Sequence, residues 1–351
     1  MAYTTIKKPS DYFNTITWSG NGTSGRNITG VGFQPDFVWY KNRTNAITHG
    51  LQDIIRGVTS TNVLSSDSNP GEPSFTNIGY LSSFDSDGFT ATETNSNLNV
   101  INASGSNYVA WNWLADNTSG SSNTDGSITS TVSANTTSGF SIVSYTGTGA
   151  NATVGHGLGA VPKMIIIKEL NNATNWIVYH AGVGNGGSLQ LNTTIATDTD
   201  STFWNSTTST SSVFSLGSNG NSNGSSDNYI AYCFAEKKGF SKFGSYTGNG
   251  STDGVFVYLG FKPAFVMIKN TATATDWEMI DNKRAGYNDF NYRLFPNTSG
   301  TENTGDKIAD ILSNGFKIRN TSTAFNGSGN TMIYMAFAEE PLVGDNPATA
   351  R

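Results

Sequence analysis

Short apolar runs alternate along this chain with stretches of glycine and small polar residues. The runs are rich in Val, Ile, Phe, Tyr and Trp, and several contain four consecutive apolar residues. Runs of this length and composition are typical of buried strands. Gly, Asn, Ser and Thr fill the stretches between them and favour turns and strand edges over helix interiors. The pattern predicts an all-β protein of antiparallel sheets with little helix.

A longer pattern of turn, proline and apolar run occurs three times. In each copy an aromatic-x-Gly-x-Gly turn is followed, 13 residues after its last glycine, by a proline. Each copy then closes on a second apolar run, at 108–113, 229–236 and 332–339. The prolines are Pro35, Pro162 and Pro263, and the lysines that end the first apolar run are Lys41, Lys168 and Lys269.

Repetition at this spacing predicts three tandem modules, each long enough to bury its own core. We expect antiparallel β-sandwiches of jelly-roll or lectin-like type over residues 1–116, 117–238 and 239–351. Because the run after each proline is continuously apolar, we expect one face of that strand in the sandwich core and the other against a neighbouring module or subunit. The lysine at its end would let the strand finish at solvent.

Three segments depart from the strand pattern. Residues 116–135 are rich in Asn, Ser, Thr and Gly and are expected to form a linker or a loose hairpin. Residues 217–228 have the composition of a surface loop. A short helix is expected at Thr304–Asn314, where Ile308, Ile311 and Leu312 fall at helical spacing.

Charge is sparse in this chain. Charged residues make up 13% of the 351 residues, the formal net charge is −6, and no basic cluster occurs. Phosphate binding needs several cations on one face, so we do not expect nucleic-acid binding. The chain opens without an apolar leader and has no run as long as a membrane span, which favours synthesis in a cytoplasm and no membrane insertion. The single cysteine, Cys233, lies in an apolar run and is expected to be buried.

The histidines give no sign of catalysis. His49, His156 and His180 are far apart in sequence and form no H-x-H or H-E-x-x-H pair. His156 lies in a glycine-rich turn, and metal or acid–base roles require converging partners. We therefore expect no catalytic residue and no enzyme activity.

Glycine and aspartate motifs also have ordinary explanations. Two G-x-G-x-x-G matches, at 20–25 and 182–187, lack the βαβ context of a dinucleotide site. Asp85–Gly88 and Asp198–Asp200 resemble fragments of calcium loops but lack the further acidic ligands of such a loop. We interpret these aspartates as turn formers and expect no metal and no cofactor, with a weak calcium site left open.

Four residues are the candidates for weak surface binding. Asp53 and Asp281 stand 18 residues after their prolines, but His180 takes that place in the second copy. Shared structure survives such a substitution and shared catalysis does not, so we interpret these positions as loop anchors, with glycan binding as the minority alternative. Most tryptophans lie in apolar runs and are expected in the core. Trp204, in a polar context, is the best candidate for a surface contact.

The third copy carries a family resemblance. Its strings Tyr246–Gly250, Gly260–Val266, Trp277–Arg284, Ser313–Arg319 and Ile333–Glu339 resemble an uncharacterised repeat domain in virion proteins of marine and cyanobacterial tailed phages. That domain often occurs in predicted tail-fibre proteins. The resemblance extends over nearly the whole chain, and it brings no established functional residues with it.

The leading hypothesis is a tail-fibre or appendage subunit of a tailed phage that takes part in host attachment. We expect a homotrimer that contacts other virion proteins through residues 2–12 and a host-surface glycan through unequal loops at 59–77, 181–223 and 285–305. The alternatives are a capsid decoration, cement or head-fibre protein and, last, a polysaccharide-depolymerising tailspike. A tailspike would show a parallel β-helix repeat of about twenty residues, which this sequence lacks.

Overall fold

The computed structural model describes residues 4–73, 75, 78–94, 100–284, 291–344 and 347–348. It is nearly all β, with 42% strand and 3% helix, which confirms the predicted class. The described residues form six sheets, and the paired strands are antiparallel. These sheets fall into three groups that follow one another along the chain, and we call each group a module.

Module 1 has an inner and an outer sheet, preceded by the 3-10 turn η1 (Pro9–Asp11). The inner sheet has the order β1-β7-β3-β4, formed by β1 (Phe13–Ser19), β7 (Asn107–Trp113), β3 (Phe37–Asn42) and β4 (Gly50–Asp53). The outer sheet has the order β2-β6-β5, formed by β2 (Arg26–Thr29), β6 (Gly88–Thr92) and β5 (Tyr80–Asp85).

Module 2 repeats this plan and extends the inner sheet at both edges. The inner order is β14-β13-β12-β16-β10-β9-β8, formed by β14 (Leu189–Gln190), β13 (Ile177–His180), β12 (Pro162–Glu169), β16 (Asn228–Ala235), β10 (Phe140–Thr146), β9 (Ser130–Asn135) and β8 (Ser121–Asn123). The outer sheet pairs β11 (Ala152–Gly155) with β15 (Val213–Leu216), and the short helix α1 is Gly220–Asn223.

Module 3 returns to the plan of module 1. Its inner order is β17-β23-β19-β20, formed by β17 (Ser241–Thr247), β23 (Thr331–Pro341), β19 (Phe261–Asn270) and β20 (Glu278–Asp281). Its outer order is β18-β22-β21, formed by β18 (Phe256–Tyr258), β22 (Gly315–Ile318) and β21 (Ala309–Leu312), and helix α2 is Thr323–Asn326.

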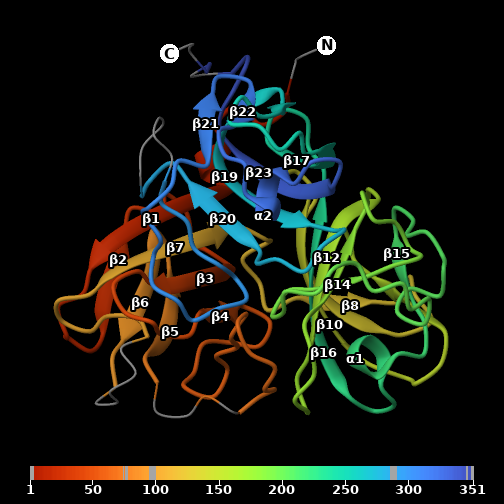
Figure 1. Cartoon of the computed structure of the whole chain (residues 1–351). Coiled ribbons are helices and arrows are strands. Elements are labelled where there is room, and N and C mark those ends of the chain that lie inside the picture. The colour runs from red at the N-terminus through yellow and green to blue at the C-terminus, as the bar shows by residue number, and fades with distance from the viewer. Residues whose placement is uncertain are drawn as a thin grey trace.

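The three modules form three lobes around a common centre (Figure 1). Module 1 is red to orange, module 2 yellow to green and module 3 cyan to blue, and both chain termini lie at the module 3 end. The boundaries predicted near 116 and 238 fall between the strand groups. Each module has its own sandwich core between its inner and outer sheets.

The strand after each proline is buried on both faces, as its apolar run predicts. In module 1, Val38 and Tyr40 point into the sandwich core, and Phe37 and Trp39 point into a fourth core that all three modules share. The same alternation along β12 and β19 follows from the period of two in a strand. The predicted neighbour on the second face is therefore the set of other modules of this chain.

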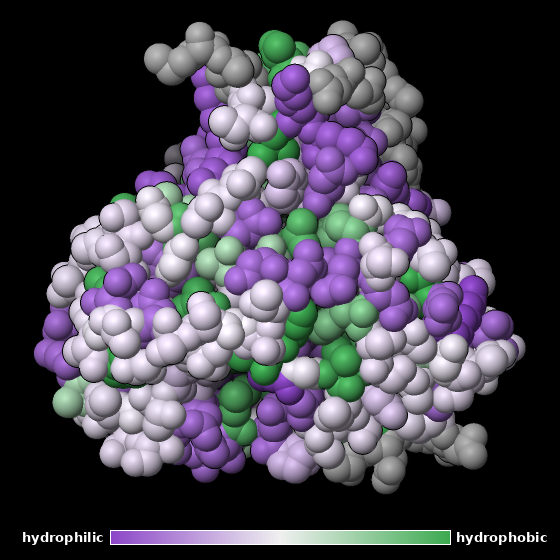
Figure 2. Space-filling view, turned by 180° about the vertical axis from the view of Figure 1, so that it is seen from behind, coloured by the Kyte–Doolittle hydropathy of each residue, from purple (hydrophilic) through white to green (hydrophobic). Residues whose placement is uncertain are grey.

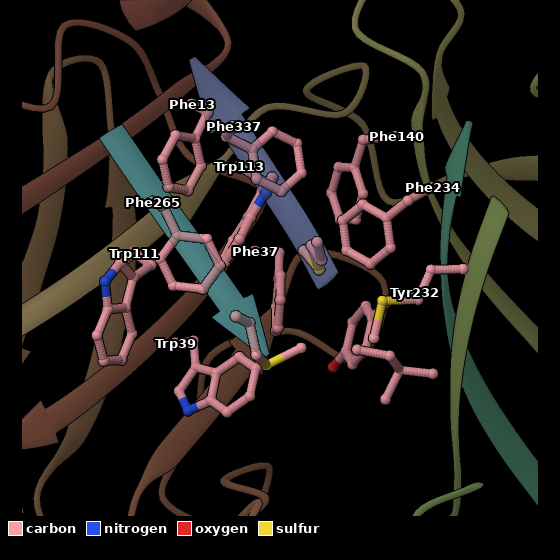
Figure 3. Packing of buried hydrophobic residues seen from close by; sticks show 14 of the residues in the cluster. Phe13, Phe37, Trp39, Trp111, Trp113, Phe140, Tyr232, Phe234, Phe265 and Phe337 are labelled. Carbon is pink, nitrogen blue, oxygen red and sulfur yellow. The ribbon is translucent and has the colours of Figure 1, made fainter. Parts of the chain in front are cut away.

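The shared core is aromatic at its centre (Figure 3). The ring of Trp113 lies 5.3 Å from that of Phe37 in its own module, 6.2 Å from Phe234 in module 2 and 5.8 Å from Phe337 in module 3. All four side chains are at most 2% exposed. Aromatic side chains bury large apolar areas, and this buried area contributes strongly to stability. The three modules are therefore parts of one folding unit rather than three independent domains.

A buried asparagine holds each glycine turn. Gly149 has a φ of 71° and donates its N–H to the carbonyl of Asn223 at 2.8 Å. The Asn223 side chain is fully buried and donates to the carbonyls of Ala150 and Gly217. Asn102 and Asn326 hold the turns of modules 1 and 3 in the same way. The polar stretch 217–228 is therefore in part interior, because its asparagine replaces water for buried backbone groups.

Two other segments that depart from the strand pattern are both β structure. The expected helix at Thr304–Asn314 is wrong, because Ala309–Leu312 is strand β21, which pairs with β22 across a tight turn. Its apolar residues alternate toward the sandwich core, and sheet pairing outweighs a helical spacing over so short a run. The segment 116–135 forms the hairpin β8–β9 on the edge of β10, the second of its two expected forms.

Candidate functional site

The three positions 18 residues after each proline are one position in the fold. Asp53, His180 and Asp281 end β4, β13 and β20, and they pair in register with Phe37, Met164 and Phe265. Each is at most 1% exposed. Each side chain bonds to the long closing strand of the next module in a closed cycle: module 1 to 2, module 2 to 3, and module 3 to 1. We call these contacts the seams.

The seam from module 1 to module 2 is charged. Asp53 pairs with Arg56, Nε to Oδ2 at 2.5 Å, and accepts a hydrogen bond from the Tyr232 hydroxyl at 2.8 Å. Arg56 also pairs with Glu72. The side chains of Arg56 and Asp53 are 4% and 0% exposed, so the charges are matched inside the protein, as buried charges must be.

The seam from module 3 to module 1 repeats that arrangement. Asp281 pairs with Arg284 at 2.6 Å and accepts a hydrogen bond from the Trp111 indole at 3.0 Å. Arg284 also pairs with Glu302 at 2.9 Å, and Glu302 in turn pairs with Arg43 of module 1 at 2.7 Å.

The seam from module 2 to module 3 carries no such pair. His180 Nδ1 accepts from the Gly182 N–H at 3.0 Å, so Nε2 carries the proton and donates to the Tyr334 carbonyl at 3.1 Å. Burial lowers the pKa of His180 to about 4, so the ring is neutral at pH 7. Met335 stands where the other seams have Tyr232 or Trp111, and a thioether cannot donate to a carboxylate. A histidine that donates to a backbone carbonyl fits this partner strand.

The prediction that Asp53, His180 and Asp281 bind at the surface is therefore wrong. Their interpretation as loop anchors holds, because Asp53 and Asp281 each accept the backbone N–H groups two and three residues on, and His180 accepts that of Gly182. In addition, each one anchors a neighbouring module. Each position faces a neighbouring module, and this contact forms only when the three modules pack against one another.

The lysines that end the first apolar run are buried, which corrects the expectation that they reach solvent. Lys41 donates to the carbonyl of Ser299 in module 3 at 3.1 Å, and Lys269 donates to that of Thr194 in module 2 at 3.0 Å. Lys168 donates to the Glu169 carbonyl at 2.6 Å. Burial lowers the pKa of each to about 8. Backbone carbonyls replace water around the ammonium groups. Lys41 and Lys269 thereby join neighbouring modules, whereas Lys168 donates within module 2.

A second cycle of contacts runs through the residues 14 positions after each proline. The Trp176 indole donates to the carbonyl of Ser65 in module 1 at 2.8 Å, and that of Trp277 to Gln190 in module 2 at 2.9 Å. His49 closes the cycle by contacting the Phe295 carbonyl of module 3 at 3.0 Å. The spacing of the two tryptophans is visible in the sequence, and extending it to module 1 would have found His49.

Trp204 is also interior, so its predicted surface contact is wrong. It is 2% exposed and its ring lies 5.5 Å from that of Tyr179. The ring belongs to the sandwich core of module 2, although residues 201–206 around it form turns, because burial of an indole contributes a large apolar area. All seven tryptophans are at most 9% exposed, in agreement with the general prediction for the aromatic residues.

The remaining candidate polar residues serve as turn anchors. Asp87 accepts the backbone N–H groups of Gly30 and Gly32, and Asp200 accepts that of Thr202. His156 Nδ1 accepts the N–H of Leu158 two residues on, as expected of a turn histidine. The part of the chain that the structure describes contains no group of three His, Cys, Asp or Glu side chains able to hold a metal ion.

A cleft of about 380 Å³ is the best candidate for ligand binding. We call it the hydroxyl cleft. It lies where the β8–β9 hairpin widens the module 2 sheet, beside Arg56 of module 1. Hydroxyl and amide side chains dominate its lining, which consists of Ile55, Arg56, Ser122, Thr129, Ser130, Thr131, Ser144, Tyr145, Thr146, Leu170, Asn228 and Tyr229. The sequence signal is the run Thr129–Thr131 between Ile128 and Val132, which lies in the segment expected to form a linker or a loose hairpin.

The side chains that line the hydroxyl cleft are mainly hydrogen-bonding groups. The described residues that line it include no Asp, Glu or His. Two of its lining residues, Thr146 and Asn228, are exposed, and the Thr146 hydroxyl donates to the Asn228 amide oxygen at 3.0 Å. On the back of the molecule, Figure 2 shows broad white to pale areas, the colour of Ser, Thr and Gly, together with purple patches of strongly hydrophilic residues and smaller green patches.

Comparison with known sequences adds one match. A family model described as a domain of unknown function (DUF7483) matches residues 8–341 and so takes in all three modules. Curated proteins show no match to the chain. Within the described residues, no helix is long and apolar enough to cross a membrane.

Proposed function

The chain belongs to the DUF7483 family, described as a domain of unknown function, and we propose that it is a non-enzymatic virion attachment protein that binds a host-surface glycan in the hydroxyl cleft. The observation that carries this proposal is the lining of that cleft. Sugar hydroxyls both donate and accept hydrogen bonds, and Ser, Thr and Asn side chains complement them in both roles.

The absence of enzyme activity in this proposal rests on the same lining. A glycosidase needs two carboxyl groups across the scissile bond, and the described lining supplies none. The acidic residues predicted as candidates, Asp53 and Asp281, are occupied by ion pairs inside the seams.

The virion role rests on the sequence resemblance to phage tail-fibre proteins. The three-lobed fold supports it, because a chain with three similar modules around one centre presents three similar surfaces to a threefold partner. The expected homotrimer stays a prediction, and analytical ultracentrifugation of the purified protein measures it. The N-terminal docking segment and the loops at 59–77 and 285–305 lie partly outside the described residues.

Binding of purified protein to host-surface polysaccharide tests the cleft. Thr146→Val removes one hydroxyl from the cleft at almost constant volume, and we expect it to weaken binding about fivefold, the equivalent of one hydrogen bond. Thr247→Val is the matched control, because Thr247 ends β17 as Thr146 ends β10 but is not among the cleft's lining residues. Equal binding by both variants, or release of reducing ends from the polysaccharide, would refute the proposal.

Labelling of intact virions tests the location. An antibody against the protein is expected to stain the tail and to reduce adsorption to host cells. Staining over the head at many copies would instead assign a capsid decoration role, and unchanged adsorption would remove the attachment role.

A further inference from the structure

A second cavity, of about 320 Å³, lies between modules 3 and 1. We call it the seam pocket. Its apolar lining comes from Pro9, Phe13, Ala264 and Ala338, and its polar lining from Lys7, Lys8, Ser10, Asn14, Asn282, Lys283, Glu339 and Glu340. The beginning of module 1 and the end of β23 meet here, at the end of the molecule where Figure 1 shows both termini.

One lining residue of the seam pocket is a buried amide whose side chain makes no hydrogen bond. Asn282 is only 6% exposed, yet both its side-chain Nδ2 and Oδ1 are without a hydrogen-bond partner. Its backbone N–H donates to the Ala264 carbonyl at 2.9 Å, which fixes the residue at the wall. Buried polar groups in proteins are nearly always paired, so an amide with a free donor and a free acceptor at a cavity wall indicates a ligand that supplies both.

In module 1, the positions equivalent to Ala264 and Asn282 lie beside a segment of the chain itself. Ile54 stands in place of Asn282 and makes the same backbone bond, to Asp36, which stands in place of Ala264. The Asp36 carboxylate accepts the N–H groups of Ala115 and Asn117 at 2.7 and 2.9 Å. In module 1, therefore, Asp36 holds a peptide segment of the chain itself as it leaves for module 2.

Module 3 treats the corresponding stretch differently. After Phe337, β23 continues along β19 as far as Pro341 instead of crossing to the next module. Ala264 has no carboxylate with which to hold a segment, and its small side chain leaves room beside Asn282. Two lining residues of the pocket, Ala264 and Asn282, thus differ from Asp36 and Ile54 of module 1, although the backbone contact between the two positions is unchanged.

We propose that the seam pocket binds an extended peptide segment of a partner protein, with Asn282 pairing to one peptide group of that segment. A peptide group offers one C=O and one N–H, the complement of the free donor and acceptor of Asn282. The inference is independent of the glycan proposal, because the hydroxyl cleft lies elsewhere and shares no lining residue with this pocket.

The charges at the mouth select the type of peptide. Lys7, Lys8 and Lys283 line it together with Glu339 and Glu340. Lys262 pairs with Glu339 at 3.0 Å and lies 4.0 Å from Glu340, and Asp11 pairs with Lys8 at 2.5 Å. Among the residues that the structure describes, the mouth and its ion-pair partners therefore comprise four lysines and three acids. A net positive mouth in a chain of net charge −6 favours a segment with an acidic side chain.

Nuclear magnetic resonance of the full ¹⁵N-labelled chain tests this proposal with N-acetyl-Ala-Asp-N-methylamide as the probe. The Asn282 side-chain signals are identified by their loss in Asn282→Ile. We expect the probe to shift them saturably, the Ala-Lys analogue to bind more weakly, and N-acetylglucosamine to leave them unchanged. Asn282→Ile copies module 1 and is expected to weaken binding roughly tenfold or more, followed on the backbone signals of Lys283 and Ala338.

Two variants keep the test decisive. Ala264→Val fills the pocket from its floor and is expected to weaken binding by a similar factor even if Asn282→Ile fails to fold. Thr247→Val, outside the pocket, is expected to bind as the wild type does. Three results would overturn the proposal: Asn282 signals that the dipeptide does not shift, Asn282 signals that N-acetylglucosamine shifts instead, or pocket variants that bind the dipeptide as tightly as the wild type. Loss of polysaccharide binding alone would not overturn it.

Discussion

The two charged seams and the neutral seam join neighbouring modules at equivalent positions, but they do so with different side chains. Asp53 and Asp281 each pair with an arginine three residues on, and both ion pairs are buried. In the neutral seam, His180 takes the aspartate position and Val183 the arginine position, and Val183 packs against the shared core. The backbone register is the same in all three.

The difference shows that the residues of each seam occur together: the carboxylate, the arginine and the opposing donor are either all present or all absent. The carboxylate of a charged seam has an arginine on its own side and a donor on the opposite strand, Tyr232 or Trp111. The neutral seam lacks all three elements together. Exchange of the aspartate or the arginine alone would leave the remaining buried charge with fewer partners, which destabilises the fold.

Breaking a charged seam is expected to have the largest effect. Asp281→Asn keeps the size of the side chain but leaves Arg284 with less compensating charge inside the protein. We expect the free energy of unfolding to fall by about 3–5 kcal/mol, measured by urea denaturation. A loss below about 1 kcal/mol would show that the seam tolerates an unmatched charge.

Acid is expected to act on the neutral seam through His180. Its pKa is about 4 in the folded protein, below the ordinary value of 6.5, so between these pH values the unfolded chain binds a proton that the folded one does not. Stability is then complete above pH 6.5 and falls as the pH drops toward 4, by about 3 kcal/mol from this residue.

His180→Gln isolates that contribution. The variant keeps a donor for the Tyr334 carbonyl but has no group that titrates. We expect the difference in unfolding free energy between pH 7 and pH 4 to be about 3 kcal/mol smaller than in the wild type. Parallel pH profiles for the two proteins would contradict the assignment.

The second cycle of contacts is expected to show smaller and equal effects. Trp176→Phe and Trp277→Phe each remove one indole donor and leave a carbonyl of the preceding module unpaired. We expect a loss of about 1–3 kcal/mol for each, measured by thermal or urea unfolding. Markedly different losses would mean that the modules do not share this contact equally.

The smallest effect is expected at an exposed ion pair. Lys8 and Asp11 are joined at 2.5 Å, but their side chains are 63% and 48% exposed. Asp11→Asn is expected to change the unfolding free energy by about 0.5 kcal/mol or less, because water and salt screen exposed pairs. A loss as large as that of Asp281→Asn would remove burial as the explanation for the seams.

Much of the fold was predictable from local pattern. The turn, proline and apolar run recur at fixed spacing, and the two-sided burial of β3, β12 and β19 followed from their continuous apolar residues. The candidate site was less predictable. Asp53 and Lys41 are polar, and nothing local says that a neighbouring module covers them. Trp204 lies in polar surroundings, and nothing local says that it joins the core of its own module.

The sequence by itself determined the class of structure, the number of repeats and the strands that would be buried on both faces. Those properties depend on side-chain period and turn chemistry, which act over a few residues. Only the tertiary structure decided that the three modules close on one another, that their lysines and ion pairs lie inside the seams, and that Asn282 is left unpaired beside a pocket. Burial of a polar group depends on what packs against it, and here those partners come from modules about a hundred residues or more away along the chain.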